Sequence, residues 1–274
     1  MIKKHLKKAL SFGVYTPNPG ITLRPLQKKL GFHIPIVLIF RPWGTKWKKK
    51  MEPFPAKLCR FISKNKSIPF IKWEPATWTT VPNKMINDYP LEKIAGGEFD
   101  IYIEKWARDA KSFKKQIWLS FGHEMNGFWY HWAGKSRQYK KALLHIYIIF
   151  RKLKVKNVRW VFCVNNYPFD YAEYFPRQLK KDKRVIIGID GYNAEGIWGL
   201  KWKPFEHIFG IPYSYTLKHF PGNKIIIGEF SCAKKGGDRN EWINDAFKSL
   251  KNDHKKISAL IWFNVDKEAD WRIF

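Results

Sequence analysis

The centre of the chain reads Ile117-Trp-Leu-Ser-Phe-Gly-His-Glu-Met-Asn-Gly-Phe-Trp-Tyr-His-Trp132. Its first five residues are apolar apart from one serine and have the character of a buried strand. The segment after Gly122 holds histidines, a carboxylate, an amide and several aromatic rings, a mixture that packs poorly as a core. In barrels and open α/β sheets, sites are built at the carboxyl ends of strands. We therefore expect Glu124 to face a cleft.

Seven further apolar runs share this strand character. Together, the eight runs cover residues 11–16, 34–40, 68–75, 117–121, 158–165, 185–193, 224–231 and 257–264. Each parallel strand needs a crossover connection, and the segments between the runs have helical character. The economical prediction is an α/β fold of the (β/α)₈ TIM-barrel type. A doubly wound open sheet is the alternative, although no glycine-rich phosphate loop follows the first run.

The segments between the strands differ in their regularity. Apolar periodicity predicts helices within residues 53–66, 99–113, 136–154 and 240–250. Ser136 is the expected N-cap of the third of these helices. Residues 168–179 have room for a short helix only, and residues 205–220 are expected to be helical in parts around Pro212. Residues 76–97 lack a sustained period and are predicted to form a long loop.

The length of the chain suits one barrel. A (β/α)₈ barrel of about 250 residues is usual, so we expect residues 1–274 to form one domain. The chain stops ten residues after the eighth run. That distance is too short for a full closing helix, which we expect to be short or absent.

The charge of the chain is strongly basic. It holds 51 Lys and Arg against 23 Asp and Glu, a formal net charge of +28. Residues 1–66 carry sixteen of the basic residues and a single acid, Glu52. Such a surface attracts polyanions without specificity. We expect a solvated basic face with at most weak binding of anionic polymers, and no specific nucleic-acid partner.

Other chemistries find little support in the sequence. Cys59, Cys163 and Cys232 are odd in number and far apart, without a disulfide or zinc pattern. The zinc motif His-Glu-x-x-His fails because Gly127 stands where its second histidine would fall. No apolar run approaches the ~20 residues of a membrane helix, and no signal peptide is visible. We expect no metal, no cofactor and no membrane span.

Polar residues follow the strands in a consistent way. Glu124 ends the fourth strand and Glu229 the seventh, while Trp73 and Glu74 end the third. In a barrel these ends converge on one face, so two carboxylates can confront one another. Two carboxyl groups on either side of an anomeric carbon are the equipment of a glycosidase. A separation of roughly 5–5.5 Å would indicate retention of configuration, and one near 8 Å inversion.

A family resemblance is carried by the same motif. His123-Glu-Met-Asn-Gly127 followed by Trp129 resembles the acid/base motif of glycoside hydrolase family 26, the β-mannanase-like enzymes. The resemblance extends, in the family's order, to Gly188-Ile-Asp-Gly-Tyr-Asn193, Ile226-Ile-Gly-Glu-Phe-Ser231 and Trp262-Phe-Asn-Val-Asp-Lys-Glu268. It covers the chain from about residue 68 onward and is weaker before that point.

The resemblance implies roles for individual residues. Glu124 looks like the acid/base, Glu229 like the nucleophile, and Tyr192 like the hydrogen-bond donor to that nucleophile. Trp262 would be the stacking platform beneath the reacting sugar. Many members of the family carry an arginine three residues before the motif's histidine, where this chain has Ser120. The substrate-binding residues expected with Tyr192 and Trp262 are His123, Asn126, Trp129 and Trp73.

The sequence therefore predicts a monomeric, retaining β-glycosidase that acts inside a polysaccharide. The first expected substrate is β-1,4-mannan, with mixed-linkage β-glucan or β-1,3-xylan close behind. The rival functions are a carbohydrate-binding barrel without turnover and a polyanion-binding protein that uses the basic N-terminal third. The resemblance implies an extracellular or cell-surface protein if a signal peptide was removed; a native start at Met1 implies a cytoplasmic one.

Overall fold

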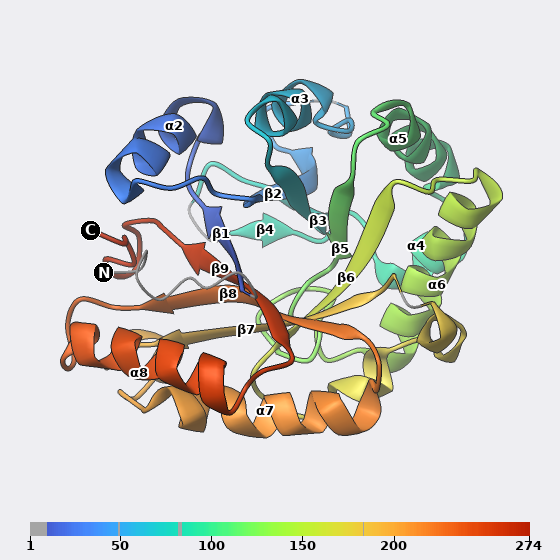
Figure 1. Cartoon of the computed structure of the whole chain (residues 1–274). Coiled ribbons are helices and arrows are strands. Elements are labelled where there is room, and N and C mark those ends of the chain that lie inside the picture. Colours follow the sequence, from blue (N-terminus) through green and yellow to red (C-terminus); the bar gives the residue numbers. More distant parts are fainter. Residues whose placement is uncertain (1–9, 49, 82–83, 183) are drawn as a thin grey trace.

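The eight apolar runs form eight parallel strands that close into a barrel (Figure 1). The computed structural model describes residues 10–48, 50–81, 84–182 and 184–274. Closure is complete because β1 pairs with both β2 and β9, and β2 pairs with β3. The strands are β1 Ser11–Tyr15, β2 Ile36–Thr45, β3 Ile68–Trp78, β5 Ile117–Phe121, β6 Val158–Asn165, β7 Ile186–Asn193, β8 Lys224–Cys232 and β9 Ile257–Phe263.

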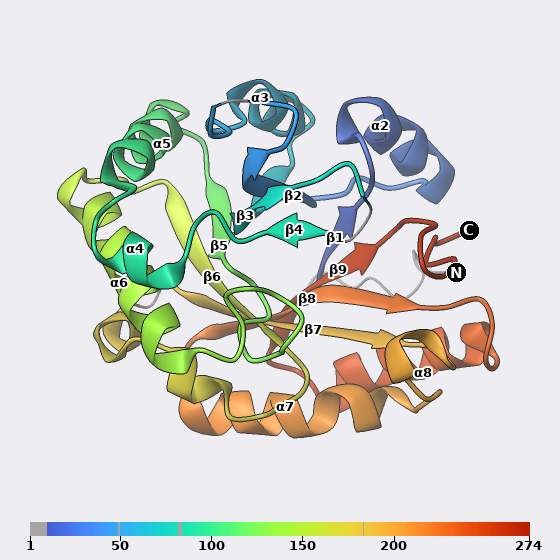
Figure 2. The same cartoon turned by 180° about the vertical axis from the view of Figure 1, so that it is seen from behind.

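Helices surround the barrel on its outer side, as Figures 1 and 2 show from opposite directions. The α-helices are α2 Pro19–Leu30, α3 Ala56–Lys64, α4 Leu91–Ala95, α5 Asp100–Ser112, α6 Ser136–Lys152, α7 Phe205–His219 and α8 Arg239–Asn252. Three 3₁₀ turns complete the set: η1 Tyr171–Tyr174, η2 Arg177–Lys181 and η3 Ile197–Gly199. Among the helices of the described ranges, none combines the length and the apolar run that a bilayer crossing requires.

Strand alternation divides the core into an outer and an inner part. In β3, Ile71 and Trp73 belong to the large cluster between strands and helices, whereas Phe70 belongs to a smaller cluster inside the barrel. Successive side chains of a strand point to opposite faces. Lys72 and Glu74 therefore point inward, on the same side as Phe70. This alternation places the polar side chains of Lys72 and Glu74 inside the barrel, near the carboxyl ends of its strands, which form the mouth of the barrel.

Three local expectations are corrected by the structure. Residues 76–97 are not an irregular loop, because β3 continues to Trp78, a short strand β4 (Met85–Ile86) pairs with it, and α4 follows. Ser136 is the first residue of α6, not its cap; the cap position is Lys135, which makes no side-chain capping bond. Residues 168–179 hold the 3₁₀ turn η1 and the start of η2 instead of one short helix.

Helix α7 runs without interruption through Pro212, where only partial helix was expected. A proline inside a helix leaves the carbonyl four residues earlier without its N–H partner. Here that carbonyl belongs to Ile208, and Asn166 Nδ2 donates to it over 3.2 Å. A side chain from the loop after β6 thus replaces the missing backbone bond.

The barrel closes without a helix after β9 in the described part of the chain. The last ten residues instead fold back over the end of β9, where the Trp271 amide donates to the Val265 carbonyl over 2.9 Å. The Trp271 carbonyl accepts bonds from Trp262 Nε1 at 2.8 Å and Ser231 Oγ at 3.0 Å. The Trp271 ring is fully buried. A short aromatic segment therefore does the covering that a closing helix would do.

Candidate active site

The site lies at the carboxyl ends of β3, β5, β6, β7 and β8. The loop that follows β5 passes across this end of the barrel (Figure 2). Five acidic or basic side chains gather there, each almost or completely buried: Lys72, Glu74, Glu124, Asp190 and Glu229. A buried cluster of this kind needs partners for every charge, so its hydrogen bonds define what the site can do.

Glu124 stands on an unusual backbone. Its φ is +52°, and Gly122 just before it has φ +49°, so the chain turns sharply as it leaves β5. A left-handed conformation is costly for a residue other than glycine, asparagine or aspartate and concentrates at functional sites. The Glu124 amide donates to the Cys163 carbonyl at 2.8 Å, which holds the turn against β6.

The Glu124 carboxyl is held by two donors. Trp129 Nε1 donates to Oε2 at 2.9 Å, and Asn165 Nδ2 donates to Oε1 at 2.9 Å. Burial, followed by the nearby Glu229 carboxylate, raises the pKa of Glu124 to about 7. A carboxyl with this pKa can give up or take a proton near neutral pH.

Glu229 has a different environment. The Tyr192 hydroxyl donates to Oε2, and the Lys72 ammonium forms an ion pair with Oε1. Residues Asp190 and Glu229 are partners in the β7–β8 register, just after a register shift. Cationic and hydroxyl donors favour the charged form of a carboxyl group. Glu229 has a cationic partner in direct contact, whereas the two donors to the Glu124 carboxyl group are neutral.

Lys72 is a member of the site that sequence reasoning missed. It is completely buried, and its ammonium also pairs with Asp190 Oδ2 at 2.6 Å. Two neighbouring carboxylates raise its pKa against the opposing effect of burial, so we take it as charged. The signal was present, since Lys72 is the one charged residue inside the run Ile68-Pro-Phe-Ile-Lys-Trp73. Without the barrel, nothing indicated that it points inward.

His123 and Glu74 lie next to each other and close to Lys72. His123 Nε2 lies 3.1 Å from the Tyr130 hydroxyl, and its Nδ1 is 3.9 Å from Glu74 Oε1. Burial, and secondarily Lys72, lowers the pKa of His123 well below its usual value, so the ring is neutral. Glu74 accepts a 2.7 Å bond from Trp78 Nε1, and burial raises its pKa to about 8.

Two predicted sugar platforms have no exposed surface. Trp73 packs between Trp43 and Trp106 on the helix side of β3. Trp262 packs against Phe230, with the guanidinium of Arg239 from α8 5.5 Å from its ring. Both expectations are wrong because strand alternation turns these rings outward. They belong to the core between strands and helices.

Asn126 is also corrected. Its Nδ2 donates to the carbonyls of Asn165 at 2.9 Å and Pro168 at 2.7 Å, and its Oδ1 accepts from the Asn165 amide at 2.9 Å. No amide hydrogen is left for a sugar hydroxyl. Asn126 instead fixes the loop that carries Asn165, whose side chain bonds Glu124.

Other aromatic rings lie on the inner side of the strands or are exposed to solvent. Phe263 stacks on Tyr15 with ring centroids 4.8 Å apart, and both lie on the inner side. Trp198 is 57% exposed and stacks on buried Trp271 at 5.6 Å. Trp129 is 45% exposed. Rings of this kind next to carboxylates suit the apolar face of a sugar.

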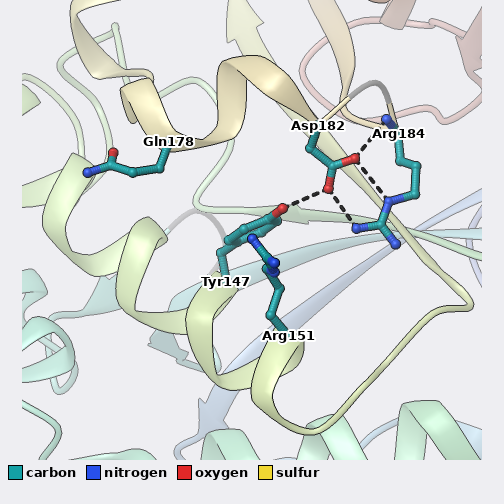
Figure 3. Close-up of a pocket in the computed structure, with 5 residues that line it drawn as sticks. All are labelled: Tyr147, Arg151, Gln178, Asp182 and Arg184. Atoms are coloured by element: carbon teal, nitrogen blue, oxygen red, sulfur yellow. Dashed lines mark hydrogen bonds and ion pairs between the residues drawn. The ribbon is translucent and has the colours of Figure 1, made fainter.

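A second recess lies away from the barrel mouth, between α6 and η2 (Figure 3). Its one carboxylate, Asp182, accepts 2.7 Å bonds from the Tyr147 hydroxyl and from Arg184. These donors hold the pKa of Asp182 below its usual value. The carboxylate is engaged in structure, so this recess is not a candidate site. In the described ranges, no group of His, Cys, Asp and Glu has the arrangement of a metal site.

Comparison with known proteins agrees with this fold. No family model matches the chain. Endoglucanase H of Acetivibrio thermocellus is 33% identical in an alignment of length 264 that covers 92% of this chain and 27% of that protein. Among solved structures, GH26A from Muricauda sp. MAR_2010_75 is similar with a TM-score of 0.64 and 16% identity, covering 92% of this chain and 83% of that one.

Two mannanase structures show the same likeness. The GH26 β-mannanase of Bacteroides ovatus has a TM-score of 0.62 at 17% identity, over 99% of this chain and 83% of that one. The modular endo-β-1,4-mannanase of Cellulomonas fimi has a TM-score of 0.66 at 12% identity, over 97% and 67%. The chain therefore has the closed-barrel fold of these GH26 structures, with two buried glutamates at the mouth of the barrel. In sequence it is similar to the endoglucanase, of which it spans about a quarter of the length.

Proposed function

We propose that this chain hydrolyses a β-linked polysaccharide with retention of configuration, using Glu124 as acid/base and Glu229 as nucleophile. The observation that carries the proposal is that two buried carboxyl groups have different hydrogen-bond and ion-pair partners. Glu229 is bonded by a lysine and a tyrosine hydroxyl, whereas the pKa of Glu124 is raised to about 7. A carboxyl group with a pKa near neutrality suits an acid, and a carboxyl group paired with a cation suits a nucleophile.

The proposed reaction has two steps. In the first, a Glu229 oxygen bonds to the anomeric carbon while the glycosidic bond breaks, and Glu124 gives its proton to the leaving oxygen. In the second, Glu124 takes a proton from water as the water oxygen attacks the anomeric carbon and the bond to Glu229 breaks. Glu124 is then protonated and Glu229 ionised again, so the protein is regenerated.

The surrounding residues have supporting roles in this proposal. Tyr192 orients Glu229 through its hydroxyl bond, and Trp129 both bonds Glu124 and presents an indole face to a sugar. His123 is neutral and next to Glu124 in the chain, where it can serve a sugar hydroxyl. No step requires a metal or an organic cofactor.

β-1,4-Mannan is the first proposed substrate, with mixed-linkage β-glucan and β-1,3-xylan as the next candidates. The printed names of the similar proteins include both mannanases and an endoglucanase. We propose cleavage within chains by a single barrel domain acting as a monomer. A reducing-sugar assay on mannan, galactomannan, lichenan, β-1,3-xylan and an acidic polysaccharide tests this. Release from a neutral β-glycan supports the proposal, and binding without release from any of them favours a carbohydrate-binding barrel.

A further inference from the structure

The feature that the proposed mechanism leaves unexplained is a lysine sealed inside the barrel. Lys72 is completely buried and bridges Asp190 and Glu229. Replacing a buried ion pair by apolar side chains is often neutral or stabilising, so such a pair is weak support for the fold itself. Its presence at the mouth of the barrel calls for a role in the site.

The position of Lys72 is set by β3 and its neighbour β5. Lys72 and Ser120 are direct Cα partners in the β3–β5 register, and both lie on the inner face between outward-facing neighbours. A side chain at position 120 therefore starts next to Lys72 and points into the same space. Position 120 holds a serine in this chain, so its short side chain brings no charge to that space. A cation at either position would reach the same anions.

The surroundings of the ammonium are strongly anionic. Asp190 and Glu229 are its ion-pair partners, and Glu124 acts on it from the loop after β5. On the remaining sides, His123 is neutral and Glu74 has a raised pKa. The Phe40 ring lies 5.7 Å from the ammonium. Lys72 is thus the cation among the described groups that face Glu229.

The support behind Lys72 is built from small residues. A Cβ on Gly228 would lie 2.5 Å from Asp190 Oδ1, and one on Gly188 would lie 2.7 Å from Cys163 Sγ. The glycines leave room for Asp190 beneath the lysine. Asp190 Oδ1 has no hydrogen-bond partner within the described part of the chain. Asp190 therefore depends on Lys72, and the lysine is held between the deeper Asp190 carboxyl group and the Glu229 carboxyl group at the mouth.

We propose that Lys72 is the positioning residue for Glu229, supplying from β3 the cation that a basic residue at position 120 would supply from β5. Its ammonium pairs with Glu229 Oε1 and holds that carboxyl group in a fixed orientation at the mouth of the barrel. When Glu229 forms the glycosyl ester it loses its charge, and Lys72 retains Asp190 as its counter-ion. When water releases the sugar, the ammonium stabilises the departing carboxylate. This role rests on the proposed function, but its electrostatic part can be measured without any substrate.

The test is the titration of Glu229, followed by ¹³C NMR in protein labelled at glutamate Cδ, with the resonance assigned by Glu229→Gln. Lys72→Met alone leaves Asp190 unpaired and puts folding at risk, so Asp190→Asn is compared with the pair Lys72→Met/Asp190→Asn. Removing the lysine should raise the midpoint of Glu229 by about one to three pH units, as loss of a close opposite charge does. Ser120→Ala is the packing control and should leave the midpoint unchanged.

A relocated cation makes the test specific. Lys72→Ser/Ser120→Lys should bring the Glu229 midpoint back toward the wild-type value, and Lys72→Arg should leave it close to that value. On an activated aryl glycoside, loss of the lysine should lower kcat by about 100-fold, with the acidic limb of the pH profile moved upward. An unchanged Glu229 midpoint without Lys72, or no recovery on relocation, overturns the proposal. A shifted midpoint in a protein that cleaves no glycan leaves the role of Lys72 intact and removes the proposed function alone.

Discussion

Trp129 Nε1 donates a 2.9 Å hydrogen bond to Glu124 Oε2, five residues earlier in the same loop. The bond ties an exposed indole to a carboxyl group that is only 7% exposed. Any sugar that stacks on the indole is thereby brought next to the proposed proton donor. The left-handed turn at Glu124 makes this geometry possible, because it folds the loop back over the end of β5.

The two glutamates should respond differently to substitution. Glu229→Ala should lower kcat by about 10⁴-fold or more on every substrate, since no glycosyl-enzyme can form. Glu124→Ala should keep much of its first-step rate on an aryl glycoside whose leaving group needs no proton, and added azide should accelerate its second step. Steady-state and burst kinetics on natural and activated substrates measure both effects. Equal loss in both variants on the activated substrate would refute the assignment.

The pH dependence should follow Glu124. Its pKa is raised to about 7, and the proton must be present to protonate the leaving oxygen. We expect kcat/KM on a natural glycan to fall above that pH by about tenfold per unit. An aryl glycoside with a good leaving group should lack this basic limb in its first step. A profile that stays flat to pH 9 on the natural glycan would contradict the role of Glu124.

Glu74 should make the stability of the protein depend on pH. Burial raises its pKa to about 8, so the folded state holds a proton that the unfolded state releases near pH 4.5. The folded state is therefore favoured at low pH and loses stability as the pH rises toward the folded value. Glu74→Gln should raise the free energy of unfolding at pH 8 relative to pH 5 by on the order of 2 kcal/mol. Denaturant unfolding at both pH values checks this, and an equal effect at both would argue against the protonated state.

Asn126 and Asn157 provide a matched comparison. Each donates two side-chain bonds to backbone carbonyls. Asn126 lies near Glu124, whereas Asn157 directly precedes β6 and bonds carbonyls of the segment ahead of β5. Substitution of either by alanine should cost about 1–3 kcal/mol of stability. Only Asn126→Ala should also lower kcat and move the basic limb, because it frees Asn165 and with it Glu124. If Asn157→Ala had the same kinetic effect, the change would reflect stability alone.

The basic charge should be independent of catalysis. Hydrolysis of a neutral glycan should change little between low and moderate salt, since an uncharged substrate gains nothing from electrostatic steering. Binding of DNA or an anionic wall polymer should be weak and should vanish with added salt. Assays of both across salt concentrations check this. Competitive inhibition by the polymer at physiological salt would place the basic surface at the site and favour an acidic glycan as substrate.

Much of this protein could be predicted from its sequence because the information is local. Eight apolar runs and the segments between them indicate the barrel, which is confirmed, since each strand must bury both faces. The motif around Glu124 and the run ending in Glu229 identified the two proposed reacting groups from residue type and order.

The tertiary structure decided which side chains reach the site. Trp73 and Trp262 differ from their inward-facing neighbours Lys72 and Phe263 by one position in their strands, and that single step turns a side chain from the mouth to the helix layer. Lys72 and Glu229 are 157 residues apart in the sequence. They become partners only because the closed sheet places β3 and β8 on opposite sides of the barrel. The sequence determines which residues occur and in what order. The closed barrel determines which face of a strand each side chain occupies and which distant residues come into contact.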